Sequence, residues 1–298
     1  MAHLATDIYS IVIDEWEINA IAFIADKSCD RFKNPAIRAF LTRSAGKGWV
    51  PTFHGIPKVH KNPWKLRPIV PFHSAFITPY SKVLEAHLSC YLPCYPWIIN
   101  STREFLRNLE RAQILSRLNT WIVTADVGNF YTYVDIALAT TRCEMIMKGH
   151  PAIQGFRTAE EVRFLMDFVN HSVFFKYQDV TYHQAKGLAM GAPSSGIIAN
   201  LFLAIEEKQW RLFDTFHKHI QMYNRYTDDI FMLFEGTKNE LEIFLSDFSF
   251  SSLKLTFHTG TTHPIPFPDC EVKMAPVEWD PIVTTPYAKP GNTHMYVP

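Results

Sequence analysis

The chain has 298 residues, of which 47% are hydrophobic and 14% are aromatic, and its formal net charge is zero. This length suffices for one large domain or two ordinary ones, and the zero net charge excludes a global basic field, so that a nucleic acid must be held by local patches. The five cysteines form no CxxC pair, which argues against zinc, and we expect reduced thiols in an intracellular protein, nuclear or cytoplasmic.

The N-terminal region, residues 4–45, is predicted to be mostly helical. Apolar residues between Ile8 and Trp16 fall near helical spacing, and Pro35 is placed to open a second helix that continues to Leu41. The apolar run at 18–25 follows acidic residues, whereas a secretory signal begins with basic ones, and no stretch reaches the length of a membrane span. We therefore expect neither a signal peptide nor a transmembrane segment.

A basic, proline-rich segment follows at residues 54–72. Its prolines interrupt any helix, and Leu66 to Val70 indicates a strand after a loop. With no acid among them, the segment carries Lys58, Lys61, Lys65 and Arg67. Such cations suit a polyphosphate or a nucleic-acid backbone, although a solvated basic loop explains the local pattern equally well.

The next two elements are a helix and a strand. Residues 101–118 are predicted to be helical, with a capping box at Ser101 and Glu104. The stretch 121–132 reads as a buried strand that ends in the carboxylate of Asp126, followed by a turn and a helix near Asp135. An acid at the end of a buried strand is costly unless it is paired or binds a metal.

The middle of the chain combines a helix, a hairpin and a glycine-rich loop. A helix is predicted at 158–171, followed by a hairpin with strands at 173–177 and 180–183. The loop at 186–196 leads into a helix from Ile197 to about His219, and its glycines allow the backbone to approach a flat ligand closely. Ordinary loops also contain glycine and proline, so this feature alone is weak evidence.

Two adjacent carboxylates, Asp228 and Asp229, lie in an aromatic and aliphatic stretch at 222–234. The pattern predicts two strands with the acids at the turn, followed by a helix at 239–248 and a strand at 253–258. The two carboxylates repel each other, and a divalent metal between one of them and a third carboxylate relieves the repulsion. Asp126 is the natural third carboxylate, whereas a solvated turn is the alternative for an isolated YxDD motif.

Taken in this order, the segments resemble a reverse transcriptase. DVGNFY around Asp126 resembles the first palm motif of that family, GLAMGAPSSGIIANLFL from Gly187 resembles the second, and YTDD at 226–229 resembles the third. HGIPKVHK, KLRPIV, PFPDC near Asp269 and the terminal AKPGNTHMY resemble more narrowly the Penelope-like element reverse transcriptases, relatives of telomerase. The resemblance extends from about residue 50 to the end, but Ala192, Ser195 and Gly196 depart from the usual second motif.

The resemblance implies an α+β right-hand fold, with an antiparallel palm sheet backed by helices and with fingers. It places N-terminal helices and fingers at 1–100, the first part of the palm at 101–150, a fingers-palm insertion with a hairpin at 151–186, and the second part of the palm with the start of the thumb connection at 187–298. The chain stops where a helical thumb would start, so a missing thumb is expected. No GIY-YIG endonuclease follows, so self-contained integration is not expected.

The resemblance also implies an RNA-directed DNA polymerase domain of a retroelement, which adds dNTPs to a primer on an RNA or DNA template. The catalytic residues would be Asp126, Asp228 and Asp229, with two Mg²⁺ ions, or Mn²⁺, held by Asp126, Asp228 and the carbonyl of Val127. Asp229 is the weaker candidate for direct coordination. A thumb or an endonuclease would be supplied by another segment or chain.

Further roles follow from the motif positions. Arg67 and Lys65 would meet the triphosphate, Tyr131 would lie under the incoming sugar, and Met190 and Gly191 would pack near the nascent base pair. The residues implied in nucleic-acid contacts are Lys58, Lys61, Pro193 and Lys254, and Lys254 is also a candidate proton donor to pyrophosphate.

Two other functions remain open. An RNA-dependent RNA polymerase shares the palm, but it usually carries Gly where this chain has Thr227, and Asn129 and Tyr131 also argue against it. A truncated or repurposed remnant that binds nucleic acid without catalysis is the second alternative.

Overall fold

The protein is described by a computed structural model covering residues 7–12, 16–44, 48–58, 63, 65–112, 119–151, 153, 158–213, 217–250, 253–260, 263–275 and 282–287. The chain divides into two compact units, and each is formed by two separate stretches of sequence. The first unit comprises residues 1–94 and 131–205, and the second comprises residues 95–130 and 206–298. The predicted division into fingers and palm names parts by their role, which the two compact units do not test, so it stays a prediction.

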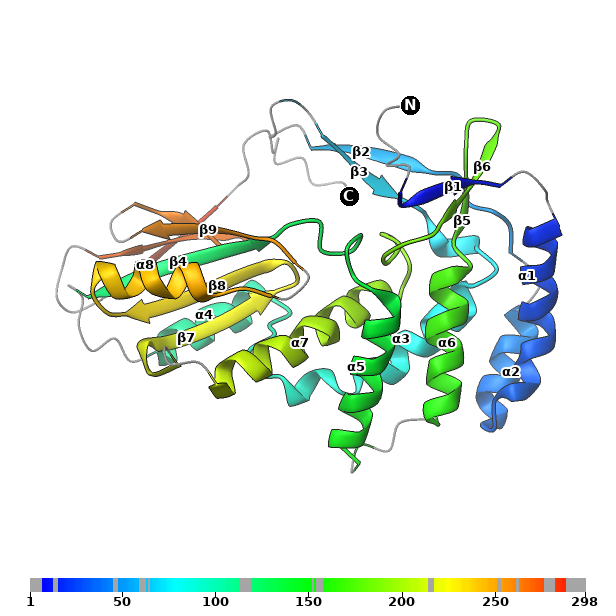
Figure 1. Ribbon diagram of the computed structural model, residues 1–298, viewed down its shortest axis with the longest axis horizontal. Coiled ribbons are helices and arrows are strands. Elements are labelled where there is room, and N and C mark those ends of the chain that lie inside the picture. Colours follow the sequence, from blue (N-terminus) through cyan, green and yellow to red (C-terminus); the bar gives the residue numbers. More distant parts are fainter. Residues whose placement is uncertain are drawn as a thin grey trace. The chain divides into compact units, whose positions relative to one another are not determined.

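The first unit contains most of the helices (Figure 1). They are α1 (Trp16–Lys27), α2 (Pro35–Ser44), α3 (Thr78–Ser89), α5 (Ile136–Gly149), α6 (Ala159–His171) and the start of α7 (Ser195–Phe213). Its strands form an antiparallel sheet of β1 (Tyr9–Ile11), β6 (Val180–Gln184) and β5 (Phe174–Tyr177), and a hairpin of β2 (His54–Lys58) and β3 (Lys65–Ile69).

Side-chain caps fix where several of these helices begin. The Thr158 hydroxyl accepts from the Glu161 amide while the Glu161 carboxylate accepts from the Thr158 amide, which is the predicted capping box of α6. The Asp135 carboxylate accepts from the Leu138 amide at the start of α5, at the predicted position.

The second unit is built on a four-stranded antiparallel sheet in the order β7-β8-β4-β9. The strands are β4 (Thr120–Val127), β7 (Ile220–Tyr226), β8 (Asp229–Glu235) and β9 (Leu255–Gly260). Helices α4 (Thr102–Arg111) and α8 (Lys238–Asp247) lie on opposite faces of this sheet (Figure 1). A smaller sheet follows, with β10 (Ile265–Pro266), β11 (Cys270–Met274) and β12 (Ile282–Pro286).

Alternation along β8 gives the sheet two apolar faces, because successive side chains of a strand point to opposite sides. Phe231 packs on Phe105 of α4, with ring centroids 4.8 Å apart. Phe234, three residues further along β8, points to the other face and packs on Phe244 of α8, with ring centroids 5.1 Å apart. Because helices cover both faces of the central strands, a ligand can reach these strands only at their ends.

Some expectations for the elements were wrong. The segment Tyr9–Ile11 is a strand paired with β6 rather than part of a helix, because the apolar spacing before Trp16 fits either element over so few residues. Pro57 does not keep residues 54–58 in a loop, since these residues form β2 and pair with β3. The strands β10, β11 and β12 were not predicted. The terminal stretch from residue 288 lies outside the described residues.

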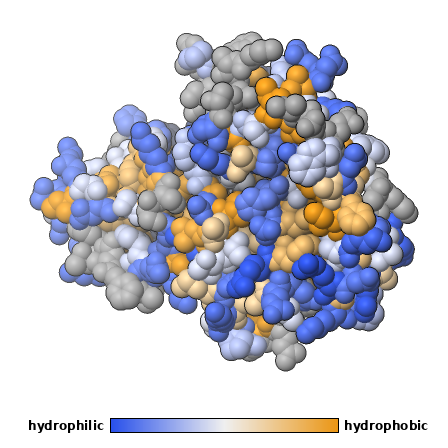
Figure 2. Space-filling model, turned by 45° about the vertical axis from the view of Figure 1, so that its right-hand side comes forward, coloured by the Kyte–Doolittle hydropathy of each residue, from blue (hydrophilic) through white to orange (hydrophobic). Residues whose placement is uncertain are grey.

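The surface shown in Figure 2 mixes hydrophilic residues with separate hydrophobic patches. Among the described helices, none combines the length and the apolar character needed to cross a membrane. All five cysteines are free thiols, as expected, with Cys29, Cys143 and Cys270 buried and Cys90 exposed. Burial raises the pKa of the Cys143 thiol to about 12, so this thiol is protonated and unreactive at neutral pH.

Candidate catalytic site

The pairing of β4 with β8 brings the acidic residues together from distant parts of the sequence. Asp126 and Asp229 are direct partners in the antiparallel register. Beside them, the Val127 amide donates to the Asp228 carbonyl over 2.9 Å. Residues directly opposite in such a pair have Cβ atoms about 4.5–5.5 Å apart and lie on the same face of the sheet. The predicted convergence of these three acids at one end of two strands is therefore observed in the backbone.

The hairpin turn between β7 and β8 holds Thr227, the residue before Asp228, in a strained conformation. Tyr226 pairs with Asp229, so that only Thr227 and Asp228 form the loop. Thr227 has a φ of 52°, the left-handed region that a β-branched residue rarely adopts, and such strain costs about 1–3 kcal/mol. The Thr227 hydroxyl also donates to Oδ1 of Asp228 over 2.8 Å. The turn thus fixes the direction of the Asp228 carboxylate.

The exposure of the acids differs from the expectation for Asp126. All but one of the other β4 residues are buried, but Asp126 is exposed, and Asp228 and Asp229 are half-buried. The argument that a buried acid needs a partner was therefore wrong for Asp126, because the strand leaves the core at this residue. Its carboxylate lies at the surface, where a ligand has access to it.

The chain after Asp126 continues the same edge of the sheet. Val127 is buried and pairs with Leu255, and the Gly128 amide donates to the Lys254 carbonyl over 2.9 Å. Asn129 then adopts a φ of 53° as the chain leaves the strand. Lys254 is exposed at the start of β9, so its backbone is fixed near the acidic end of β4.

The donor atoms at this end of the sheet suit a hard divalent cation only in part. Within the described ranges, no group of three or more His, Cys, Asp or Glu side chains forms a ready-made metal cage. The available oxygens are those of two or three carboxylates and a backbone carbonyl. Magnesium fits such a set, because it binds oxygen, keeps several waters and commonly combines one or two carboxylates with substrate phosphates.

A second group of predicted residues gathers in the first unit, on the β2–β3 hairpin. The register pairs Lys58 with Lys65 and Ile56 with Arg67, which places these positions on one face. Arg67 is exposed, and Lys61 lies outside the described residues.

The glycine-rich loop packs against the end of β3. The Val70 amide donates to the Met190 carbonyl over 3.0 Å, and the Leu188 amide donates to the Tyr131 carbonyl over 2.7 Å. Gly191 has a φ of 115°, and a Cβ on it would lie 2.2 Å from the Val70 carbonyl oxygen. The close approach of this glycine is to the backbone of Val70.

The predicted residues therefore form two groups. Asp126, Val127, Asp228, Asp229 and Lys254 lie in the second unit. The first unit holds Lys58, Lys65, Arg67, Tyr131, Met190, Gly191 and Pro193.

A buried ion pair under the hairpin turn was missed by the sequence reasoning. Arg225 donates from Nε to Oε1 of Glu207 over 2.6 Å and from Nη2 to Oε2 over 3.1 Å, and both side chains are at most 1% exposed. The Tyr223 hydroxyl and the Trp97 indole also donate to this carboxylate, over 2.6 and 2.8 Å. The sequence did contain a signal for this pair: Arg225 lies in a mostly apolar strand, and a charge buried there needs a partner.

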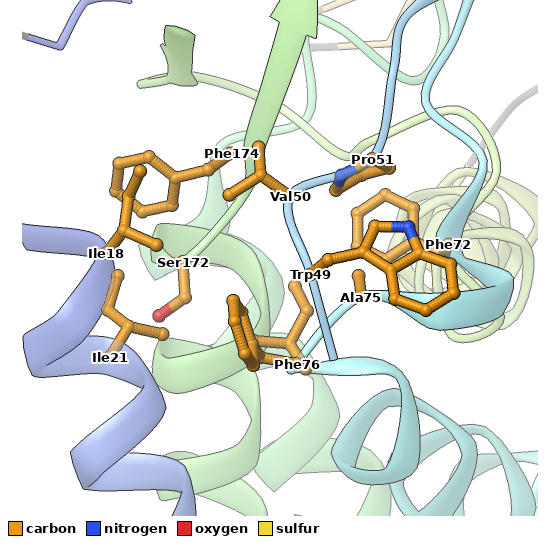
Figure 3. Close-up of a pocket in the computed structure, with 11 residues that line it drawn as sticks. Ile18, Ile21, Trp49, Val50, Pro51, Phe72, Ala75, Phe76, Ser172 and Phe174 are labelled. Atoms are coloured by element: carbon orange, nitrogen blue, oxygen red, sulfur yellow. The ribbon is translucent and has the colours of Figure 1, made fainter. Parts of the chain in front are cut away.

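The cavity in Figure 3 offers no alternative site. It lies in the first unit, has a volume of about 20 Å³ and is lined mainly by apolar side chains, including Ile18, Phe72 and Phe174. Ser172 is the one side-chain hydroxyl among its lining residues. A cavity of this size holds about one water molecule, which needs two to four polar partners.

Comparison with solved structures identifies the fold. Telomerase from Candida albicans, in complex with the TWJ fragment of telomeric RNA, matches with a TM-score of 0.56 and 12% identity over 87% of this chain and 50% of that chain. Apo telomerase from Candida tropicalis matches with a TM-score of 0.55 and 12% identity over 76% and 48%. The RNA-dependent RNA polymerase of a human picobirnavirus matches with a TM-score of 0.52 and 11% identity over 75% and 43%.

No family model and no curated protein matches the sequence. The chain spans about half the length of these three solved structures, and at these identities the likeness shows the fold alone. That fold is the α+β polymerase palm type, with antiparallel sheets and helices, as expected from the motifs.

Proposed function

We propose that the chain is an RNA-directed DNA polymerase domain of a retroelement, of the Penelope-like type. One observation carries the proposal: the β4–β8 register places Asp126 beside Asp229 and fixes the Asp228 turn against Val127. The palm-type fold and the order of the three sequence motifs support it. Whole-protein properties, including partner chains, are part of the proposal because the chain matches only part of its structural neighbours.

In this proposal, Asp126, Asp228 and the Val127 carbonyl hold the divalent ions. Two Mg²⁺ ions held there would supply positive charge when a primer 3′-hydroxyl attacks a dNTP and pyrophosphate leaves. The exposed position of Asp126 leaves room for substrate phosphates, and the two-residue turn keeps Asp228 from swinging away. Asp229 shares the face of Asp126 and adds negative charge that attracts the cations.

The residues of the first unit would bind the nucleotide and the template. Arg67 and Lys65, with Lys58 as their neighbour on β2, supply cations for the triphosphate. Tyr131, tied by its carbonyl to Leu188, supplies a ring under the incoming sugar that leaves no room for a 2′-hydroxyl. Met190 and Gly191 would then pack near the nascent base pair.

The structural neighbours include both a reverse transcriptase class and viral RNA polymerases, so the choice of sugar needs separate support. RNA polymerases usually carry Gly at the position of Thr227. The φ of Thr227 lies in the left-handed region, which glycine adopts most easily, so this turn keeps a left-handed residue without a glycine. Together with Tyr131, this favours the reverse transcriptase over the RNA polymerase. The telomerase neighbour in complex with RNA supports an RNA template.

Primer extension on an RNA template tests the proposal. The purified chain is given a labelled primer with dNTPs or with NTPs, in Mg²⁺ or in EDTA. The proposal predicts Mg²⁺-dependent extension with dNTPs and little with NTPs. Extension with NTPs would assign an RNA polymerase, and salt-sensitive binding without extension in either mixture would assign a non-catalytic nucleic-acid-binding remnant.

A further inference from the structure

The Arg225–Glu207 pair is unusual because it is a complete ion pair with almost no exposure in the interior of the second unit. Buried ion pairs often contribute little net stability, since the desolvation cost offsets the attraction, and apolar replacements are frequently as stable. A role in specifying one conformation is the best-attested reason for keeping such a pair. The element next to this pair is the hairpin turn that carries Asp228.

The guanidinium reaches that turn directly. Its Nη1 donates to the Thr227 carbonyl over 2.9 Å, while Nε and Nη2 are occupied by Glu207. The backbone of Arg225 is held as well, because its amide donates to the Trp97 carbonyl and its carbonyl accepts from the Ile99 amide, each over 2.9 Å. The guanidinium is therefore a fixed donor aimed at the residue whose backbone is strained.

The carboxylate partner is fixed in the same way. Glu207 accepts from Tyr223 and Trp97 in addition to Arg225, so that both carboxylate oxygens have two donors. These donors come from β7 and from the segment before α4, whereas Glu207 itself lies on α7. Three separate parts of the unit thus determine the direction of the guanidinium.

We infer that Arg225 is a positioning residue, which holds Thr227 in its left-handed conformation and thereby sets the direction of Asp228. Only glycine adopts a positive φ freely, so Thr227 needs an external contact to stay there. The geometry supplies one such contact, from Nη1 to the Thr227 carbonyl. The expected effect on metal binding rests on the proposed function. The expected effect on the conformation of the turn does not depend on it.

The test combines Arg225→Lys with Thr227→Gly, alone and together. Lysine keeps the charge but lacks the planar fork that serves Glu207 and the Thr227 carbonyl at once. Glycine at 227 adopts the turn without help, so it should make Arg225 less important. The matched control is Arg142→Lys, because Arg142 is also buried and donates to a carbonyl, that of Phe202 over 2.9 Å, but lies in the first unit.

Two readouts are followed beside thermal melting. Amide hydrogen exchange of Val127, which donates to the Asp228 carbonyl, reports the turn without any metal. Binding of Mn²⁺ alone, followed by electron paramagnetic resonance, reports the carboxylates. We expect Arg225→Lys to accelerate exchange at Val127 and to weaken Mn²⁺ binding by about tenfold or more, as losses of outer-shell partners do. In the Thr227→Gly background the same substitution should have a clearly smaller effect.

The Arg142→Lys control should lower the melting temperature without changing either readout. Unchanged exchange and unchanged Mn²⁺ affinity in Arg225→Lys would overturn the inference, and so would equal losses with Thr and with Gly at 227. Should Arg225→Lys not fold, Trp97→Phe removes one hydrogen bond to Glu207 and should move both readouts in the same direction. Absence of Mn²⁺ binding by the wild type would count against the proposed function, while exchange at Val127 still decides the inference.

Discussion

At the scale of single residues, the contrast between Asp126 and its neighbours on β4 carries the most information. The strand is buried on both faces, yet Asp126 is exposed and lies directly opposite Asp229. Two carboxylates in this relation repel each other, and a core packing role is excluded by the exposure. Their placement favours a site where positive charge is supplied by a ligand.

Divalent cations should therefore stabilise the folded protein through these carboxylates. We expect Mg²⁺ or Mn²⁺ to raise the melting temperature, with a stabilisation of about 2.7 kcal/mol at a concentration 100 times the dissociation constant. In Asp126→Asn the rise should be lost, while in EDTA the variant should be at least as stable as the wild type, because one of two opposed like charges is gone. Differential scanning fluorimetry measures both effects, and an undiminished cation effect in Asp126→Asn would remove this residue from the metal site.

Tyr131 is the second residue whose role is open to a direct test. We predict that Tyr131→Val lets the proposed polymerase incorporate ribonucleotides, because a smaller side chain leaves space for the 2′-hydroxyl. The control is Tyr133→Val, since Tyr133 is an aromatic residue of the same segment that is 57% exposed. The measurement is the ratio of kcat/KM for dNTP and NTP. An unchanged ratio in Tyr131→Val would defeat the assignment of Tyr131 to the sugar.

At the scale of elements, the glycine-rich loop and β3 behave as one structure. Val70 bonds to Met190, and Gly191 approaches the Val70 carbonyl more closely than any side chain allows. The loop therefore holds the end of the strand that carries Arg67. Its glycines are needed by this packing, whether or not a base pair lies on the loop.

Replacing Gly191 by alanine should disrupt this contact. Both the φ of 115° and the 2.2 Å distance from a Cβ to the Val70 oxygen oppose it, and we expect a loss of about 2–4 kcal/mol in the free energy of unfolding. Gly149→Ala is the matched control, because a Cβ there meets nothing within 4 Å and alanine favours the helix α5. Urea denaturation measures both, and similar stability of the two variants would contradict the described packing.

The elements best predicted from sequence are those with strong local signals. The β7–β8 hairpin was evident from two acids between aromatic and aliphatic runs, and α6 from Thr158 and Glu161. Strand β1 was not recognised, because three residues carry too little periodicity and its partner β6 is far away in sequence. The short strands β10 and β12 each end in proline, at Pro266 and Pro286, which argues against a strand locally.

At the scale of the whole molecule, the order of the motifs predicted the fold, but the buried contacts that hold the site residues in place could not be predicted from sequence. The α+β palm type could be predicted because three chemistry-bearing segments occur in one order. The Glu207–Arg225 pair could not, because a glutamate within α7 looks like part of a solvated helix face until the fold places Arg225 against it. Sequence thus supplies the hypothesis of which side chains carry the chemistry, whereas tertiary contacts decide how each is held.

The proposal as a whole depends on the acids acting as a Mg²⁺-dependent catalytic centre. Asp228 is half-buried and lies in a turn, so Asp228→Ala should leave the fold and the melting temperature nearly unchanged. The matched control is Asp247→Ala, at the exposed end of α8 in the same unit.

The most direct measurement is therefore the rate of primer extension on an RNA template by the wild type, Asp228→Ala and Asp247→Ala over a range of Mg²⁺ concentrations. The account predicts that the wild type and Asp247→Ala extend the primer with the same Mg²⁺ dependence. It predicts no extension by Asp228→Ala at any Mg²⁺ concentration. Extension by Asp228→Ala with normal Mg²⁺ dependence would contradict it.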